Sequence, residues 1–263
     1  MSKARDGANT LLTIGTTLAA KAPLASPVFT GNVGLGTSSP DERLHVMESS
    51  AGSVTAHTES VIVAERSGNC YFSAIGTTGA GLLMANTAGN EIGRINYGFS
   101  DNIMQFYTSN AEALRINSAG IVTKPLQPAF SAQAVATNNF GVGAWHIMNC
   151  TEIFDNNADF NPSTNKFTAP VTGRYQLNLT LRLDNLQTNA SYFYVNIQTS
   201  NRANYNIMAT DGYDAAVPYF GISTSVLADM DAGDTANVNY YIAAGSSVSD
   251  IHNESRFTGF LVC

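Results

Sequence analysis

The chain has 263 residues, of which 44% are hydrophobic and 13% are charged, and its formal net charge is −7. So few charged residues argue against a long helical protein, and an acidic surface repels the phosphates of nucleic acids. No apolar run is long enough to cross a bilayer, so we expect no membrane insertion.

The first 30 residues lack the two-residue period of a strand. The stretch from residue 10 to residue 20 is expected to form one short helix, after which Pro23 and Pro27 impose extended backbone. Four apolar side chains favour an anchor onto a larger assembly over a disordered tail: Leu11, Leu12, Ile14 and Leu18. The polar start lacks an apolar signal core, so no secretory signal is expected.

Four segments in the first half of the chain resemble bacteriophage tail-fibre proteins. They are residues 2–6, 22–31, 31–46 and 93–120. The resemblance implies a virion protein that is made in the host cytoplasm and exposed on the particle surface. It also implies that residues 1–30 dock onto a tail or capsid protein of the virion.

Residues 31–124 contain short apolar runs that are separated by turn pairs such as Ser67-Gly68. The runs are residues 61–64, 71–75, 81–84, 92–97, 103–107 and 114–116. Short strands are marginal alone in water, and pairing with identical chains around a three-fold axis would supply the missing burial. No sustained heptad is present, so we expect a β-rich, intertwined trimeric shaft rather than a coiled coil. A monomeric β domain is the alternative.

Residues 125–263 are predicted to form a C-terminal head, which follows a proline-containing hinge at residues 124–128. Its clearest element is a strand whose apolar side chains alternate with polar ones: Tyr175, Leu177, Leu179, Leu181 and Leu183. Successive side chains of a strand leave opposite faces, so this strand is half-buried. Two further strands are expected to line the core through Phe193, Val195 and Ile197, and through Ala236, Val238, Tyr240 and Ile242.

Several segments of the head resemble the complement-component-one-q globular head, whose family shares a trimeric jelly roll with the tumour necrosis factors. In chain order they are residues 129–132, 153–156, 160–175, 225–234 and 255–262. The resemblance implies an opening strand at 129–132, a late hairpin at 225–234 and a closing strand at 255–262. We expect seven side chains to form the core or the trimer contacts: Phe167, Tyr175, Leu177, Leu179, Phe257, Phe260 and Leu261.

The sequence contains no catalytic constellation, so we expect no enzyme activity, no cofactor and no metal. The four histidines lack a second ligand at zinc-site spacing. Asp229, Asp231 and Asp234 suit a calcium ion, but a Gly-Asp turn explains their clustering equally well. Three widely spaced cysteines are expected to be buried, reduced thiols, although the last one could cross-link subunits: Cys70, Cys150 and Cys263.

Residues 201–220 lack steady alternation and mix tyrosines with Asn, Asp and one Arg. Flat rings stack on the apolar faces of sugars, and amides and carboxylates bind hydroxyls. The same mixture is found on adaptable protein-binding surfaces. We predict six receptor-binding residues here: Tyr205, Asp211, Tyr213, Asp214, Tyr219 and Phe220. The alternative is that these rings fill the trimer interface.

These patterns predict an all-β protein with an N-terminal anchor (residues 1–30), a shaft (31–124) and a jelly-roll head (125–263). We expect a homotrimeric phage virion fibre that attaches the particle to a host surface glycan or protein by adhesion, without catalysis. The alternative is a purely structural virion component, a capsid decoration or tail connector, whose head is a trimerisation cap. A polysaccharide-degrading spike is disfavoured, because the sequence shows neither a long β-helix nor a carboxylate-lined cleft.

Overall fold

The computed structural model describes residues 29–53, 55–210 and 212–263, the side chains of residues 90 and 91 excepted. Within these residues the chain forms twenty strands and no helix, which confirms the all-β fold class. No helix of this part is therefore long and apolar enough to cross a membrane. The chain divides into two compact units, Met1–Ala74 and Ile75–Cys263. The predicted anchor at residues 1–30, with its helix at 10–20, lies almost wholly outside the described residues.

The described part of the first unit contains three short parallel strands. They are β1 (Val33–Leu35), β2 (Leu44–Met47) and β3 (Ile62–Glu65), with β2 in the centre. The apolar run at 71–75 was expected to be a strand, and this prediction is wrong. No strand of the described chain pairs with this run, and Tyr71 and Phe72 are almost fully exposed. An unpaired strand leaves its backbone groups without partners, so it has no reason to form.

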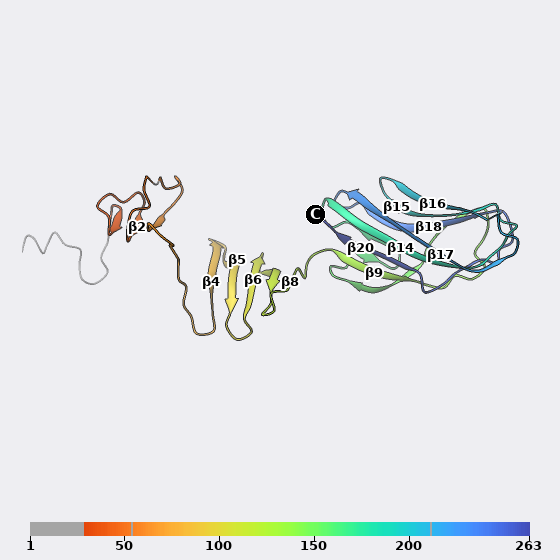
Figure 1. The fold of residues 1–263 in the computed structure, drawn as a ribbon, viewed down its shortest axis with the longest axis horizontal. Coiled ribbons are helices and arrows are strands. Elements are labelled where there is room, and N and C mark those ends of the chain that lie inside the picture. The colour runs from red at the N-terminus through yellow and green to blue at the C-terminus, as the bar shows by residue number, and fades with distance from the viewer. Residues whose placement is uncertain (1–28, 54, 211) are drawn as a thin grey trace, which may run out of the picture. The chain divides into compact units, whose positions relative to one another are not determined.

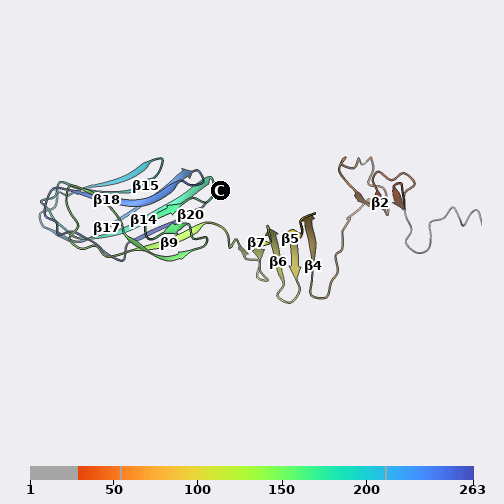
Figure 2. The ribbon, with the colours of Figure 1, turned by 180° about the vertical axis from the view of Figure 1, so that it is seen from behind.

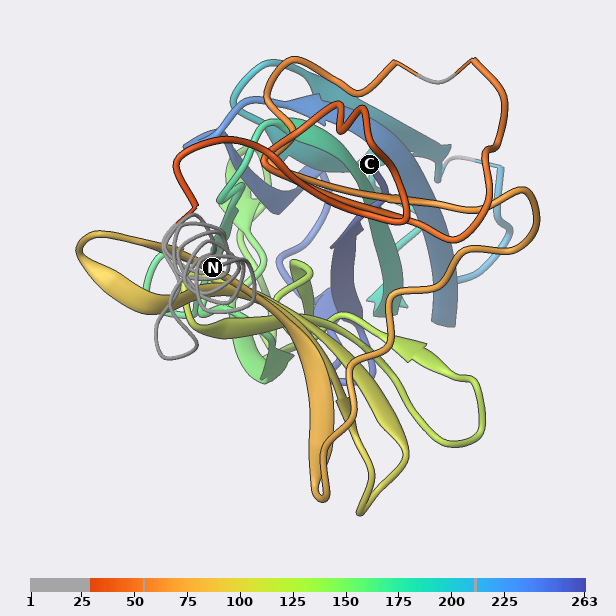
Figure 3. The same ribbon diagram turned by 90° about the vertical axis from the view of Figure 1, so that its left-hand side faces the viewer.

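The second unit begins with a five-stranded antiparallel meander, drawn from yellow to green in Figures 1 and 3. Its strands are β4 (Gly79–Asn86), β5 (Gly89–Gly98), β6 (Ile103–Thr108), β7 (Ala111–Ile116) and β8 (Val122–Thr123). Four predicted apolar runs therefore lie in strands. Leu82, Leu83 and Met84 are each exposed over half of their surface, so this chain alone leaves much of β4 uncovered. That the uncovered side chains meet other copies in a trimeric shaft stays a prediction.

The rest of the chain forms a sandwich of two antiparallel sheets, which Figures 1 and 2 show from opposite sides. Sheet I has the order β12 (Phe160–Asn161), β13 (Lys166–Thr168), β18 (Thr235–Ala243), β15 (Tyr192–Thr199) and β16 (Ala203–Ala209), and β10 (Trp145–Ile147) also pairs with β18. Sheet II has the order β11 (Cys150–Asp155), β9 (Ala129–Ala134), β20 (Arg256–Leu261), β14 (Gly173–Leu186) and β17 (Val217–Met230), and β19 (Asp250–Ile251) also pairs with β14. The predicted jelly-roll sandwich is confirmed.

The core lies between the two sheets and is built from alternating positions. In β14 every second side chain from Tyr175 to Leu183 is buried, as the sequence predicts. The predicted core residues of β15 and β18 are also buried. Fully burying one leucine contributes roughly 1.5–3 kcal/mol, so the leucines of β14 are a large part of the stability of the head. The buried Tyr175 hydroxyl donates to the Val171 carbonyl oxygen at 2.7 Å, so burial leaves no orphaned polar group there.

The predicted hairpin at residues 225–234 is wrong in one respect. β17 and β18 follow each other in the chain, but β17 pairs with β14 in sheet II and β18 pairs with β13 and β15 in sheet I. The turn between them therefore crosses from one sheet to the other. Gly233 has φ of 93°, a conformation that glycine adopts without steric cost.

Candidate functional site

The outward face of sheet I carries a group of aromatic side chains. In the strand register, Tyr194 lies opposite Ile207 on one side and Tyr241 on the other, and Tyr241 lies opposite Trp145. Residues directly opposite each other in antiparallel strands point to the same face of the sheet. In the next row, Asn196 of β15 lies between Tyr205 of β16 and Asn239 of β18. Four strands thus present their side chains on one surface.

Five rings of this surface contact one another, and we call them the aromatic platform: Trp145, Tyr192, Tyr194, Tyr205 and Tyr241. The centroid of the Trp145 ring lies 5.3 Å from that of Tyr241 and 6.0 Å from those of Tyr194 and Tyr205. The rings of Tyr192 and Tyr194 meet edge to face, with centroids 4.8 Å apart. Such spacings are typical of favourable aromatic pairs, so the rings hold one another in place.

Two rings of the platform are exposed and the other three are partly buried, although all five side chains are large and mostly apolar. Trp145 keeps 49% of its surface exposed and Tyr205 keeps 56%. β15 is the clearest case, because Phe193 and Val195 fill the core while Tyr192 and Tyr194 face outward. A solvated sheet face is normally polar, and a contiguous exposed apolar surface marks an interaction site.

Amide side chains continue the platform along β15 and β18. Asn196 is only 2% exposed, and its Oδ1 atom has no hydrogen-bond donor among the described residues. Asn237 donates from Nδ2 to Oδ1 of Asn239 at 2.6 Å. All register positions on the outward face of the four strands are uncharged: Trp145, Ile147, Tyr192, Tyr194, Asn196, Gln198, Ala203, Tyr205, Ile207, Ala209, Thr235, Asn237, Asn239, Tyr241 and Ala243.

The structure separates the predicted receptor-binding residues. Tyr205 belongs to the platform, whereas Tyr219 lies on β17 of sheet II. Tyr213 and Phe220 contact each other with ring centroids 6.4 Å apart, and Phe220 also packs against the core. Asp214 is exposed. Asp211 lies outside the described residues.

Tyr219 is part of a charged cluster at one end of sheet II. The Arg182 guanidinium lies 4.7 Å from the centroid of the Tyr219 ring, and its nitrogens donate to Asp184 at 2.8 Å and to Glu254 at 2.7 Å. The Arg182 guanidinium holds the pKa of the Glu254 carboxyl below its usual value. All four groups satisfy one another, so this cluster has the character of a surface ion-pair network.

The seven predicted core or trimer residues fall into three groups. Five are buried in the sandwich: Phe167, Tyr175, Leu177, Leu179 and Phe257. Leu261 is partly buried and packs against the core. Phe260 points outward from β20, the central strand of sheet II, and is 45% exposed.

The outward face of sheet II is also largely uncharged near Phe260. Leu227, Gln176 and Phe260 form one row across β17, β14 and β20. The row on one side consists of Ser225, Asn178 and Thr258, and the row on the other side contains Arg174 opposite Asp229. The two uncharged rows can be covered by another protein surface without stranding a charge.

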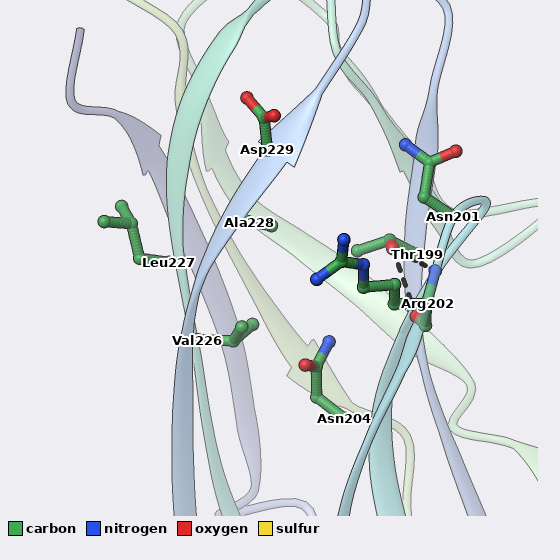
Figure 4. A pocket seen from close by; sticks show the side chains of 8 residues that line it. All are labelled: Thr199, Asn201, Arg202, Asn204, Val226, Leu227, Ala228 and Asp229. Atoms are coloured by element: carbon green, nitrogen blue, oxygen red, sulfur yellow. Dashed lines mark hydrogen bonds between the residues drawn. The ribbon is translucent and has the colours of Figure 1, made fainter.

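A pocket of about 360 Å³ opens at the edge between the sheets, where β16 and β17 are the edge strands. Its lining residues are Thr199, Asn201, Arg202, Asn204, Val226, Leu227, Ala228 and Asp229. Figure 4 shows the Arg202 side chain pointing into the pocket from the turn between β15 and β16. Thr199 fixes that turn, because its Oγ1 accepts a hydrogen bond from the Arg202 backbone N–H at 2.9 Å.

In the acidic cluster at the β17–β18 turn, the Asp234 carboxylate accepts hydrogen bonds from its own turn and from the β15–β16 turn. The Asp234 carboxylate accepts from the Ser200 hydroxyl at 2.7 Å, from the Asn201 side-chain amide at 2.6 Å and from the Asp231 backbone N–H at 2.8 Å. These bonds, led by the one from Ser200, lower the pKa of Asp234. These contacts hold Asp234 in the turn that joins β17 to β18.

One group in the first unit has metal-ligand chemistry, namely Asp41, His45 and Glu65, whose ligand atoms lie within 4.8 Å of one another. His45 is buried, and both of its ring nitrogens are in use. Nε2 lies 3.1 Å from Glu65 Oε2, and Nδ1 accepts from the Asp41 backbone N–H at 3.3 Å. The imidazole therefore links β3 to the turn before β2, and these contacts give His45 a structural role.

Comparison with known proteins bears on the sandwich alone. The family model described as the C1q domain matches residues 129–262. The globular domain of zebrafish complement 1qA protein is 17% identical, with a TM-score of 0.39, over 52% of this chain and 98% of its own. Eiger TNF from S. frugiperda is 11% identical, with a TM-score of 0.38, over 52% and 94%. Murine APRIL is 12% identical, with a TM-score of 0.37, over 51% and 98%. Among curated proteins, none matches the chain.

Proposed function

Since this chain belongs to the C1q domain family, we propose that it is a homotrimeric adhesion protein whose C-terminal head binds a partner on a cell surface. The head acts by binding and carries out no catalysis. The aromatic platform is the observation that carries this proposal. It places five rings, two of them exposed, on regular strands of the sandwich, at outward positions of four strands that carry no charge. Aromatic side chains with a polar tip are enriched where proteins bind partners.

We further propose that the protein is a bacteriophage virion fibre that attaches the particle to its host. The four tail-fibre-like segments between residues 2 and 120 support this assignment. In this proposal residues 1–30 dock onto a tail or capsid protein, residues 31–124 form the trimeric shaft, and the head meets a host surface glycan or protein. Three heads on one fibre bind together, so a weak single site still gives tight attachment.

A second candidate is a purely structural virion component with the head as a trimerisation cap. The exposed Leu227 and Phe260 side chains on sheet II favour it, because self-association alone explains such exposed apolar side chains on a virion protein. Leu227 is 56% exposed in the single chain, so a trimer contact there would bury substantial apolar surface.

The experiment that separates the two is a pull-down of host cell-envelope fractions with the immobilised full-length chain, after light scattering has shown the mass of three chains. The adhesion proposal expects a surface glycan or a surface protein to be retained and then released by free full-length chain. A well-formed trimer that retains nothing would contradict adhesion and favour the structural candidate.

A further inference from the structure

We infer that the aromatic platform is a binding site for an uncharged saccharide, with Trp145 and Tyr205 stacking on sugar rings and Asn196 accepting a hydrogen bond from a sugar hydroxyl. This inference rests on the proposed adhesion function and names the chemistry of the partner. The site lies on sheet I and includes only Tyr205 of the six receptor-binding residues that the sequence indicated.

The first argument is the way in which Trp145 and Tyr205 meet. They lie on β10 and β16, which are separated in sheet I by β18 and β15. Three strand spacings of about 4.8 Å place these two backbones about 14 Å apart. Their ring centroids are nevertheless 6.0 Å apart, so both side chains lean across the sheet and meet over its central strands. The two rings are tilted by 54°, so they form a crease and not a flat surface.

The crease suits a pyranose ring. One face of such a ring carries axial C–H bonds, which are apolar and slightly positive, and the face of an aromatic ring is slightly negative. Two tilted rings, each about half exposed, offer stacking surfaces to two adjacent sugar units or to two faces of one unit. The rings sit on strands and not on loops, so little freedom is lost on binding.

The second argument is the buried amide beside Tyr205. Asn196 lies on β15, directly opposite Tyr205 on one side and Asn239 on the other. It is 98% shielded from solvent, but its Oδ1 atom lacks a donor among the described residues. Buried polar atoms in native proteins are nearly always hydrogen-bonded. A hydroxyl donor that enters under the Tyr205 ring would satisfy this atom, whereas a purely apolar partner would leave it orphaned.

The third argument is charge. The outward positions of β10, β15, β16 and β18 are uncharged, and the polar ones are mostly amides. An acidic sugar or a phosphate bound there would lose its hydration without a cationic partner. Amides, in contrast, exchange hydrogen bonds with neutral hydroxyls. The chemistry of the face therefore favours a neutral saccharide over a charged one.

The protein carries its own probe for this site, because Trp145 is the single tryptophan of the chain. We would titrate the full-length chain with the neutral polysaccharide fraction of the host envelope, freed of protein, and with 3′-sialyllactose as an acidic probe. The expected result is a saturable change in Trp145 emission with the neutral fraction only. Tyr205→Ala and Asn196→Leu should each weaken binding about tenfold, the size of one lost stacking or hydrogen-bonding partner.

Tyr71→Ala is the matched control, since Tyr71 is an exposed tyrosine of the other unit and should leave the titration unchanged. If Asn196→Leu fails to fold, the exposed Tyr205 variant still tests the site. An unchanged emission with the neutral fraction, or equal binding by Tyr205→Ala, would overturn the inference.

Adsorption of the same protein to host cells distinguishes failure of the saccharide inference from failure of the adhesion proposal. Cells treated with periodate, which cleaves sugar diols, should lose adsorption, and protease-treated cells should keep it. Loss after protease alone would mean a protein partner, so adhesion would stand and the saccharide inference would fall. No adsorption to untreated cells would contradict the adhesion proposal itself.

Discussion

Burial decides which of the three cysteines can react. Cys150 is buried beside the core, where loss of water raises the pKa of its thiol to about 12. Cys70 and Cys263 are exposed, so the expectation that all three thiols are buried is wrong for these two. The sequence showed only that the three are too far apart for a metal site, and spacing alone does not reveal which strand positions face solvent.

A thiol titration checks this difference. Only the thiolate attacks a disulfide reagent, and at pH 8 a group with a pKa near 12 is almost wholly protonated. We expect Cys70 and Cys263 to react quickly in the native protein and Cys150 to react only after unfolding. A Cys150→Ala variant should keep the fast phase unchanged. Three equally fast thiols in the native protein would contradict the buried position of Cys150.

At the scale of the element, the close packing of β20 against the core requires a glycine at position 259. Gly259 lies opposite Leu177 on the inward face of sheet II. A Cβ atom at Gly259 would lie 2.6 Å from Leu177 Cδ2 and 2.7 Å from Phe130 Cε1. Gly259→Ala should therefore force the core apart and lower the free energy of unfolding by about 1–3 kcal/mol.

The matched control is Gly221→Ala on β17, where a Cβ would meet no atom of the described residues within 4 Å. That change should be nearly neutral. Denaturant unfolding of both variants at equal protein concentration makes the comparison, since the stability of an oligomer depends on concentration. Equal midpoints for the two variants would mean that β20 does not pack as closely as described.

The same elements show what the sequence could and could not predict. The alternation in β14, β15 and β18 was enough to place the core, because only a half-buried strand needs that period. The β17–β18 turn was predicted as a hairpin, because a Gly-Asp turn between two strands looks the same whether they share a sheet or not. Whether the two strands share a sheet depends on the strands with which each one pairs, and those strands lie far away in the sequence.

The platform was missed for a related reason. Binding residues were sought in the irregular stretch at 201–220, and only Tyr205 of that set lies in the platform. A signal was nevertheless present: Tyr192 and Tyr194 alternate with Phe193 and Val195, so the first half of β15 is apolar or aromatic on both faces. The contact between Trp145 and Tyr205 had no such signal, because it depends on the order of four strands.

At the scale of the whole molecule, the two faces of the head suit two tasks. The outward face of sheet II, with Leu227 and Phe260, is proposed to hold three copies together, and the platform on sheet I is proposed to bind the partner. Because the two faces belong to opposite layers of one sandwich, both can be covered at once. Trimerisation then multiplies a weak saccharide contact into firm attachment.

The measurement that tests this account most directly is adsorption of labelled full-length chain to host cells, comparing the native chain with the double variant Trp145→Ala/Tyr205→Ala. Both side chains are about half exposed, so their removal should leave the fold and the trimer mass unchanged. The account predicts that the double variant remains a trimer by light scattering and loses at least 90% of the adsorption, because the loss at each site (~0.5–1.5 kcal/mol per ring) is multiplied across three heads. A trimeric double variant that adsorbs as well as the native chain would contradict it.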